Sequence, residues 1–408
     1  MSPAFPVTAY AAINALGTTT RDVVAHLRDG LTGLGSCPLE LPFETPTGAL
    51  PEPPPALPAS LAAWDSRTAR LAVAGLEEIL PALARAIARH GADRVAMVVG
   101  TTTSGLGRTE DAYHELKRTG ALPQDYELHL QHSFGAMMEA LRRVTGVRGP
   151  CFAVSTACSA SAKAVGSAQR LLATGGADAV LVGGVDALSQ TTLRGFHSLQ
   201  ILSPVFCRPL SRERRGINIG EGVAYLLLER EGDAATRLLG VGESSDAHHM
   251  SAPDPTGEGA RTAMAAALAQ AGLPADEVDY INAHSPGTKL NDLSEGLAIT
   301  ALFGARVPVA STKGYTGHLL GAGGATEAVF SIVAIEQGWI PRSVGAEPVD
   351  VDLGLNVPTA RLDTPCRNVL SNSFAFGGNN VALLFGRTRG EPASSARRVP
   401  SREGSGTL

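Results

Sequence analysis

FAVSTACSASAK, residues 152–163, is the stretch that says most about the fold of this chain. An apolar, strand-like run ends near Ser155, and small residues that suit a helix follow it. The stretch therefore predicts a strand that turns directly into a helix, with Cys158 at the turn. Unpaired N–H groups and the helix dipole at such a turn favour the thiolate, the reactive form of cysteine. A free cysteine is also often a small buried hydrophobe, so a catalytic role requires partner residues elsewhere.

The rest of the chain repeats this alternation of short apolar runs and alanine-rich segments. We expect strands over 95–99, 151–155, 179–182, 224–228, 307–310 and 381–385. We expect helices over 67–90, 134–145, 159–174, 259–272 and 318–337. The first of these helices has Asp65 or Ser66 as its cap and is split or kinked at Pro81. Such alternation predicts an α/β fold in which helices cover a buried sheet.

Two similar turns suggest an internal duplication. VSTAC at 154–158 leads from a strand into a helix, and VASTK at 309–313 does the same. This similarity divides the chain near residue 245 and predicts two similar lobes, residues 1–245 and 246–386, whose helix N-termini face one site. The proline-rich segment 38–58 is expected to be a surface loop, and 387–408 a disordered tail.

Composition narrows the functional class. The 408 residues are 44% hydrophobic and 18% charged, enough to bury a large core. Five scattered cysteines argue against disulfides and against a CxxC metal site. A net charge of -5 gives no basic field for nucleic acid. No apolar run reaches the roughly 18 residues of a membrane span, and the N-terminus has no signal-like pattern, so we predict a cytoplasmic protein with no membrane partner.

Two histidines are the candidate partners of Cys158. His284 follows a strand-like run, 278–282, and strand ends are where α/β folds place their chemistry. A loop histidine held by backbone groups is the alternative. His318 lies in a glycine-rich turn between Lys313 and Glu327. That turn contains neither GxxxxGK[ST] nor GxGxxG, so tight helix packing explains its glycines better than a nucleotide site does.

A further glycine-rich turn, NSFAFGGNN at 372–380, has two interpretations. It can be a hairpin or strand entry in which glycines adopt positive φ. It can also be an oxyanion hole, because glycine lets backbone N–H groups approach a developing negative charge. His248 and His249 do not predict a metal site, because adjacent histidines on an extended segment point to opposite sides and no third ligand is suitably spaced.

Together these motifs resemble those of the β-ketoacyl-acyl-carrier-protein synthases, the elongating ketosynthases of fatty-acid and type II polyketide assembly within the thiolase superfamily. The resemblance covers about residues 5–386 and rests on four ordered motifs. They are STACS at 155–159, NAH at 282–284, STK at 311–313 with TGHLLGA at 316–322, and NSF at 372–374 with FGG at 376–378. The resemblance implies a thiolase-like fold: two duplicated βαβαβαββ lobes in layered α-β-α-β-α arrangement.

The resemblance also implies a role for each motif. Cys158 would accept an acyl chain from a carrier protein, and His284 and His318 would stabilise the enolate formed when malonyl carrier protein loses CO2. Backbone N–H groups of Cys158 and Phe376 would form the oxyanion hole. The implied catalytic residues are Cys158, His284, His318, Lys313 and Glu327, the last two as an orienting pair. The implied substrate contacts are Thr288, Phe376, Phe196, Ala157 and Leu128.

The motifs separate this chain from related enzymes. An initiating ketosynthase is expected to have Asn at the position of His318, and a degradative thiolase is expected to have a second Cys in the turn around Phe376. A chain-length-factor partner lacks the nucleophile, which Cys158 supplies. A non-catalytic partner subunit and a thiol hydrolase are the alternatives to a condensing enzyme.

Departures from the family pattern bear on the substrate. SPGT at 285–288 replaces the usual Gly-Thr-x-Thr that contacts phosphopantetheine, and Ala375 replaces the glycine before the gating Phe376. The residues that fall where pocket-lining residues are expected are Leu128, His129, Gln131 and His132. These departures predict a specialised pathway, such as aryl polyene or other type II polyketide synthesis; housekeeping fatty-acid elongation is the alternative.

The family also implies the partners. The expected ones are an acyl carrier protein and a second subunit, in a homodimer or in a heterodimer with a ketosynthase-like chain. Carrier proteins are acidic, so Arg208 with Arg212, Arg214 and Arg215 is the candidate docking patch. No cofactor or metal is expected, because the phosphopantetheine arm belongs to the carrier protein.

Overall fold

The computed structural model describes residues 3–387, in which ten strands form one sheet of order β3-β2-β4-β5-β1-β6-β10-β9-β7-β8. The first half-sheet contains β1 (Phe5–Asn14), β2 (Val95–Gly100), β3 (Cys151–Val154), β4 (Ala179–Asp186) and β5 (Gly222–Glu229). The second contains β6 (Thr236–Ser245), β7 (Tyr280–Asn282), β8 (Val309–Ala310), β9 (Asn368–Ala375) and β10 (Asn379–Arg387). β1 joins the halves, because it pairs with β5 and, through Phe5 and Pro6, with β6.

The two half-sheets repeat one topology. β2 is parallel to β3 and β4, as β7 is to β8 and β9. β5 is antiparallel to β4 and β1, as β10 is to β9 and β6. The duplication suggested by the two turns is therefore present in the strand order. β6 belongs to the second half-sheet, whereas the predicted division at residue 245 places it in the first lobe.

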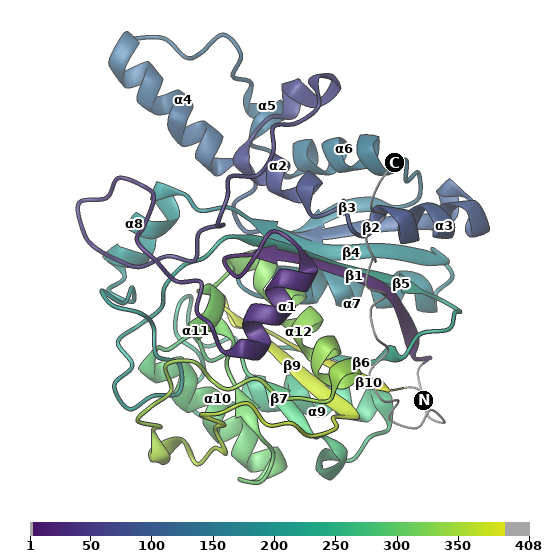
Figure 1. Ribbon diagram of the computed structural model, residues 1–408, viewed down its shortest axis with the longest axis vertical. Coiled ribbons are helices and arrows are strands. Elements are labelled where there is room, and N and C mark those ends of the chain that lie inside the picture. Colours follow the sequence, from purple (N-terminus) through teal and green to yellow (C-terminus); the bar gives the residue numbers. More distant parts are fainter. Residues whose placement is uncertain (1–2, 388–408) are drawn as a thin grey trace, which may run out of the picture.

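Helices form three layers around the two half-sheets (Figure 1). α2 (Arg67–Ala74), α3 (Leu80–His90) and α6 (Phe134–Thr145) cover the outer face of the first half, and α9 (Glu258–Ala271) and α10 (Lys289–Phe303) that of the second. α7 (Ala160–Ala173) and α12 (Gly323–Gln337) lie between the halves. The remaining helices are α1 (Thr20–Asp29), α4 (Leu106–Thr119), α5 (Leu128–Gln131), α8 (Gln190–Ser198) and α11 (Lys313–Thr316). The layers are thus α-β-α-β-α.

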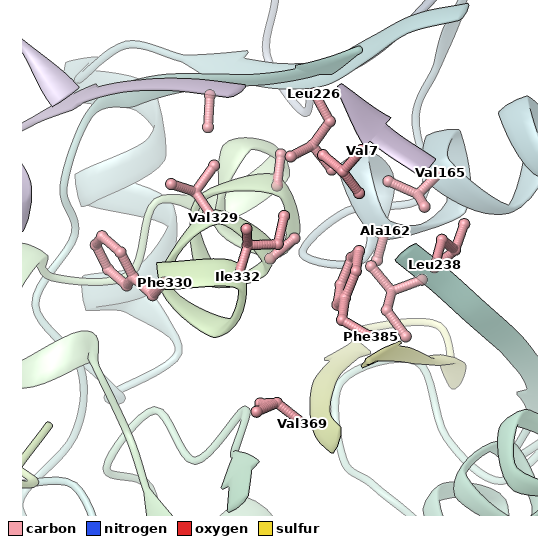
Figure 2. Packing of buried hydrophobic residues seen from close by; sticks show 14 of the residues in the cluster. Val7, Ala162, Val165, Leu226, Leu238, Val329, Phe330, Ile332, Val369 and Phe385 are labelled. Atoms are coloured by element: carbon pink, nitrogen blue, oxygen red, sulfur yellow. The ribbon is translucent and has the colours of Figure 1, made fainter. Parts of the chain in front are cut away.

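The central helix layer is the core of the molecule (Figure 2). Ala162 and Val165 of α7 and Val329 and Ile332 of α12 pack against both half-sheets. From Gly323 to Ile335 every residue of α12 is buried, so this helix has no polar face. A helix that is apolar all round is stable only when other layers enclose it, as the two half-sheets do here.

Most predicted elements are present, with shifted ends. α2 is capped by Ser66, and Pro81 lies in the first turn of α3, so the helix expected over 67–90 is divided as predicted. The helix expected over 318–337 begins only at Gly323, because the chain leaves helical conformation at Leu320, where φ is 50°. The elements not predicted include β1, β6, β9, α1, α4, α5, α8 and α11.

The segment 38–58 is more than a surface loop. It contains no helix or strand element, but Thr45, Thr47 and Leu50 are buried. Gly48 packs so closely on the second half that a Cβ there would lie 1.8 Å from the carbonyl oxygen of Thr316. β10 continues to Arg387, and the rest of the predicted tail, 388–408, lies outside the described residues. Within residues 3–387 no helix is long and apolar enough to cross a membrane.

Candidate active site

Cys158 lies in a tight turn between β3 and α7, as the sequence predicts. β3 ends at Val154 and α7 begins at Ala160, so the turn places Cys158 just before the helix. Ala157 precedes it with φ of 51°, a conformation that is unfavourable for a residue with a Cβ. Cys158 is only 7% exposed and lines a cavity of about 340 Å³. The turn therefore presents the thiol to an enclosed space.

Burial dominates the electrostatics of this thiol. It raises the pKa of Cys158 to about 11, while the charge of Lys313 and the N–H group of Phe376 lower it. Asp186 also raises this pKa, and the N–H of Cys158 itself lowers it. Desolvation thus outweighs the expected preference for thiolate at the helix terminus, and the resting thiol is neutral near pH 7.

His284 lies beyond the end of β7, and a buried carboxylate holds its backbone. The N–H group of His284 donates to Oε1 of Glu295 at 2.9 Å. Ser285 donates to Oε2 of Glu295 through its N–H group at 2.7 Å and its hydroxyl at 2.8 Å. The side-chain amide of Asn372, on β9, donates to Oε1 at 3.0 Å. Glu295 therefore fixes the His284 loop against two elements of the second half.

The sequence reasoning missed Glu295 and a second buried acid, Asp292. Asp292 accepts hydrogen bonds from the N–H groups of Leu210 at 3.0 Å and Gly287 at 3.2 Å. Burial raises the pKa of Asp292 to about 7, against the effect of these donors and of Arg214. The available signal was the i, i+3 spacing of the two acids at the start of the helix after His284, which places them on one face.

His318 faces His284 across the cavity. The two rings are 5.3 Å apart between centroids, at an interplanar angle of 80°. The backbone N–H group of His318 donates to the backbone carbonyl of Asn218 at 2.7 Å. The ring nitrogen Nδ1 of His318 is buried and has no hydrogen-bond partner among the described residues. Burial and the charge of Lys313 lower the pKa of both histidines well below 6.5. Both imidazoles are therefore neutral near pH 7, and each keeps one N–H donor.

Lys313 and Glu327 form a buried ion pair behind the histidines. Lys313 Nζ lies 2.5 Å from Glu327 Oε1, and both side chains are almost fully enclosed. Burial raises the pKa of Glu327 to about 7, while the charge and hydrogen bond of Lys313 lower it. The charge of Lys313 acts on Cys158 and on both histidines, so this pair sets the field of the whole site.

The turn around Phe376 connects β9 to β10. Gly377 and Gly378 adopt φ of 82° and 75°, as the hairpin interpretation requires. The N–H of Gly377 donates to the carbonyl of Met250 at 2.8 Å, which ties the turn to a neighbouring loop. The N–H group of Phe376 lies next to the thiol of Cys158 and lowers its pKa. The hairpin thus also aims a backbone donor at the thiol, the geometry that the second interpretation requires.

The cavity brings together most of the predicted site residues. It is lined by Cys158, His284, His318, Thr288, Phe196 and Phe376, with Lys289 and Arg215 among the other lining residues. The rings of Phe196 and Phe376 are 6.0 Å apart. Lys313 and Glu327 lie behind this lining, next to the histidines. Residues from both half-sheets therefore enclose one space at the ends of α7 and α12.

Two predicted substrate contacts, Ala157 and Leu128, are not among the residues that line this cavity. Ala157 is the neighbour of Cys158 in the chain, whereas Leu128 lies apart from the cavity. It is the first residue of α5 and is 51% exposed, because α5 turns Gln131 inward instead. Gln131 donates to the carbonyl of Asp125 at 2.9 Å, in a separate polar depression. His132 contacts the Thr109 hydroxyl at 2.6 Å. In the single chain this segment does not line the cavity that contains Cys158, and its role in the substrate pocket stays a prediction.

His248 and His249 lie in a loop beside the cavity. Nδ1 of His249 accepts hydrogen bonds from the N–H groups of Ser251 and Ala252, at 3.1 and 3.2 Å. Within residues 3–387, no group of three His, Cys, Asp or Glu side chains is arranged to hold a metal ion.

Comparison with known families agrees with this site. The model of the β-ketoacyl synthase N-terminal domain matches residues 57–234, and that of the C-terminal domain matches residues 235–347. The chain belongs to the β-ketoacyl synthase family. The boundary between the two matches falls just before β6, where one half-sheet meets the other.

Individual relatives of this β-ketoacyl synthase match most of the chain. Nodulation protein E of Rhizobium meliloti (strain 1021) is 33% identical over 93% of this chain and 98% of its own length. The 3-oxoacyl-[acyl-carrier-protein] synthase 2 of Staphylococcus aureus is 34% identical over 73% of this chain and 78% of its own. These relatives make the protein an acyl-transferring synthase of the fatty-acid and type II polyketide kind.

A solved structure confirms the thiolase-like fold of this ketosynthase. A chain of the complex between the ketosynthase ApeO and its chain length factor ApeC, from Xenorhabdus doucetiae, superposes with a TM-score of 0.89 at 39% identity. The match covers 95% of this chain and 98% of that one. The α/β fold class expected from the motifs is therefore correct.

Proposed function

We propose that this ketosynthase catalyses the decarboxylative Claisen condensation of malonyl carrier protein with an acyl chain held on Cys158. One observation carries the proposal. The thiol of Cys158 shares a single cavity with two neutral imidazoles and with Phe376, whose N–H group lowers the pKa of the thiol, and the buried charge of Lys313 acts on the thiol and on both imidazoles. This set provides a nucleophile, two neutral donors and an oxyanion hole.

In the first half-reaction Cys158 takes the acyl group. Its sulfur attacks the carrier thioester, and the carbonyl oxygen gains negative charge that the N–H groups of Cys158 and Phe376 stabilise. The proton of the Cys158 thiol leaves with the departing carrier thiol. Lys313 favours the developing thiolate, which offsets part of the desolvation that keeps the resting thiol neutral.

In the second half-reaction the malonyl group loses CO2. The electron pair of the broken C–C bond forms an enolate, whose oxygen accepts hydrogen bonds from the N–H groups of His284 and His318. Their lowered pKa values keep both rings neutral, so each ring donates one hydrogen bond without giving its proton up. The enolate carbon then attacks the acyl carbonyl on Cys158, and the thiolate of Cys158 leaves.

A specialised pathway of the aryl polyene or type II polyketide kind is the proposed setting. The hydroxyl of Ser285 is engaged by Glu295, and Pro286 lines the cavity, so of this motif only Thr288 offers a hydroxyl to a phosphopantetheine arm. The 39% identity to a chain of the ApeO–ApeC complex supports the same setting. Housekeeping elongation is the second candidate, because the Staphylococcus aureus relative is a 3-oxoacyl-carrier-protein synthase.

A second thiolase-fold subunit is the proposed structural partner, as another copy or as a chain-length-factor-like chain. β3 is an outer strand of the sheet, and its Phe152 is 39% exposed. Leu128 and Phe134, on the adjacent α5 and α6, are 51% and 41% exposed. An unpaired strand edge beside exposed apolar side chains suits pairing with another chain.

Carrier docking is proposed at the cavity mouth, with a smaller patch than the sequence suggests. Arg214 is buried and paired with Asp350, and Arg208 is paired with Glu213. Arg212 and Arg215 are exposed and form no ion pair with described residues, and exposed Lys289 lines the mouth. Reversal of Arg212 to Glu, a residue outside the cavity lining, should weaken carrier binding and leave the reaction with small thioesters unchanged. Unchanged carrier affinity would remove Arg212 from the proposed docking patch.

The deciding experiment is intact-mass analysis of the protein with a panel of acyl carrier proteins. The proposal predicts one acyl adduct on Cys158 that persists until malonyl carrier protein is added and then becomes β-ketoacyl product. Rapid release of free acid without malonyl carrier protein would instead identify a hydrolase. A non-catalytic partner subunit would form no adduct with any acyl carrier protein, and its complex would stay fully active after Cys158→Ala.

A further inference from the structure

A buried carboxylate without an assigned role, Asp186, lies beside the nucleophile turn. It is the last residue of β4 and is completely enclosed. No lysine, arginine or histidine in the described part of the chain forms an ion pair with it. An isolated charge in such a place is costly unless several donors replace the water around it. Its surroundings are therefore informative.

Backbone and hydroxyl donors surround Asp186 completely. Oδ1 accepts from the Thr101 hydroxyl at 2.8 Å and from the N–H group and hydroxyl of Thr103, both at 3.0 Å. Oδ2 accepts from the N–H groups of Thr102 at 2.9 Å and Gly321 at 2.7 Å. Burial raises the pKa of this carboxyl, and these donors lower it. Donors on this scale suit an ionised carboxylate.

Three strained turns meet at these donors. Ala157, Ser104 and Leu320 have φ of 51°, 47° and 50°. The carbonyl of Ala157, next to Cys158, accepts from the Thr102 hydroxyl at 3.3 Å. The N–H of Ser104 donates to the Thr101 hydroxyl at 3.1 Å. Leu320 directly precedes Gly321. Such conformations persist only where the surroundings hold them in place.

The turn after His318 fits this carboxylate closely. A Cβ on Gly321 would lie 2.7 Å from Asp186 Oδ2 and 2.8 Å from the N atom of Thr102. Any side chain there would force the His318 turn away from β4 and from the Thr101–Thr103 segment. Gly321 is thus required for the close approach that makes the 2.7 Å hydrogen bond.

We propose that Asp186 is a positioning residue that holds the Cys158 turn and the His318 turn against each other. The nucleophile turn is linked to it through Thr102, and the histidine turn through Gly321. This proposal rests on the proposed function, because it assigns the two half-reactions one common buried support.

The same carboxylate acts against the thiolate. The titratable groups that face Cys158 are Lys313, Asp186, His284 and His318. Asp186 is the negative one, and its charge disfavours ionisation of the thiol. Asp186→Asn therefore has two effects of opposite sign: the thiol ionises more readily, while the donors of both turns lose a carboxylate acceptor and the turns move. If Asp186 had only a structural role, its substitution would lower the melting temperature without making the thiol ionise more readily.

The test measures both effects in the purified, folded protein. Iodoacetamide alkylation of Cys158 is followed against pH, a readout that does not depend on the proposed function. Acyl transfer to Cys158 and CO2 release from malonyl carrier protein are measured separately. For Asp186→Asn we expect the alkylation midpoint to move to lower pH and both half-reactions to slow by roughly 10- to 100-fold. An unmoved midpoint with unchanged rates would overturn the proposal.

Thr102 supplies a milder, matched pair of variants should Asp186→Asn not fold. Thr102→Val loses the hydroxyl that holds Ala157 but keeps the charge of Asp186 and the N–H group. It should slow acyl transfer by about tenfold, with CO2 release less affected and the alkylation midpoint unmoved. Thr102→Ser keeps the hydroxyl and should restore acyl transfer. The proposal would be contradicted if the Val and Ser variants transferred acyl groups at equal rates. If Asp186→Asn shifts the alkylation midpoint but the protein is inactive in every condensation assay, only the proposed function is contradicted.

Discussion

Equivalent strand ends in the two half-sheets carry different side chains. In the first half, β2, β3 and β4 are followed or ended by Thr101–Thr103, Cys158 and Asp186. In the second, β7, β8 and β9 lead to His284, Lys313 with His318, and Phe376. In the proposed mechanism the first half supplies the nucleophile and its support, and the second supplies the donors and the buried cation. A repeated backbone fixes where chemistry can occur, and the side chains at each position decide which chemistry it is.

The connections to the two central helices differ as well. Residues 155–159 link β3 to α7, whereas residues 311–322 link β8 to α12 and include α11. The longer connection gives the second half room for both Lys313 and His318. The shorter one leaves only the single tight turn that presents Cys158.

The largest expected effect separates the two halves directly. Cys158→Ala should abolish the acyl-enzyme and lower condensation by about 10³-fold or more, because the first half loses its nucleophile. CO2 release from malonyl carrier protein should persist, since the second half is intact. Intact mass and CO2 release measure the two outcomes. Loss of CO2 release together with the adduct would break the proposed division of labour.

The reverse experiment removes donors from the second half. His284→Ala and His318→Ala should each lower CO2 release by about 10²- to 10³-fold, because one donor to the enolate is lost. Acylation of Cys158 should continue, as intact mass would show. His114→Ala, on the exposed face of α4, is the matched control. A variant that loses acylation as strongly as CO2 release would show that the halves do not act separately.

A smaller effect concerns stability. The pKa of His318 is lower in the folded chain than the ordinary 6.5, so the unfolded chain binds more protons below pH 6.5. Neutral buried His318 therefore does not reduce the free energy of unfolding above pH 6.5. As the pH falls below 6.5, the free energy of unfolding decreases by about 1.4 kcal/mol per pH unit through this histidine. In urea titrations between pH 6.5 and 5, His318→Gln should lose less free energy of unfolding than the wild type. Identical pH dependence would mean that His318 accepts a proton without cost.

The smallest expected effect tests the gate between the halves. Ala375→Gly removes the Cβ next to Phe376 and should let its ring move more freely against Phe196. We expect a change of about threefold in the preference between long and short acyl carriers, measured by competition. Ala375→Ser keeps a Cβ and is the control. A preference that changes equally in both variants would exclude backbone freedom as the cause.

The sequence was sufficient to find the central residues of the site, because motifs at strand ends reflect local geometry. Cys158, His284, His318 and Phe376 each follow a predicted strand or precede one, and all four line one cavity. Asp186 and Glu295 could not be found in this way. Their importance comes from donors on distant segments, such as Gly321 and Asn372, which only the folded chain brings near them.

Two further errors have the same origin. β9 was missed because its buried stretch includes Ser371, Asn372 and Ser373, which lower strand propensity. The predicted arginine patch wrongly includes Arg214, because its partner Asp350 lies 136 residues away in sequence. Tertiary contacts therefore decided both cases against the local pattern.

The position of β10 has a consequence for biosynthesis. Among residues 3–387 it is the last strand in chain order, yet it lies in the interior of the sheet, between β6 and β9. The N–H group of Phe376, just before it, completes the surroundings of a thiol made more than two hundred residues earlier. A growing polypeptide consequently carries an incomplete site until β9 and β10 have been synthesised and have joined the sheet.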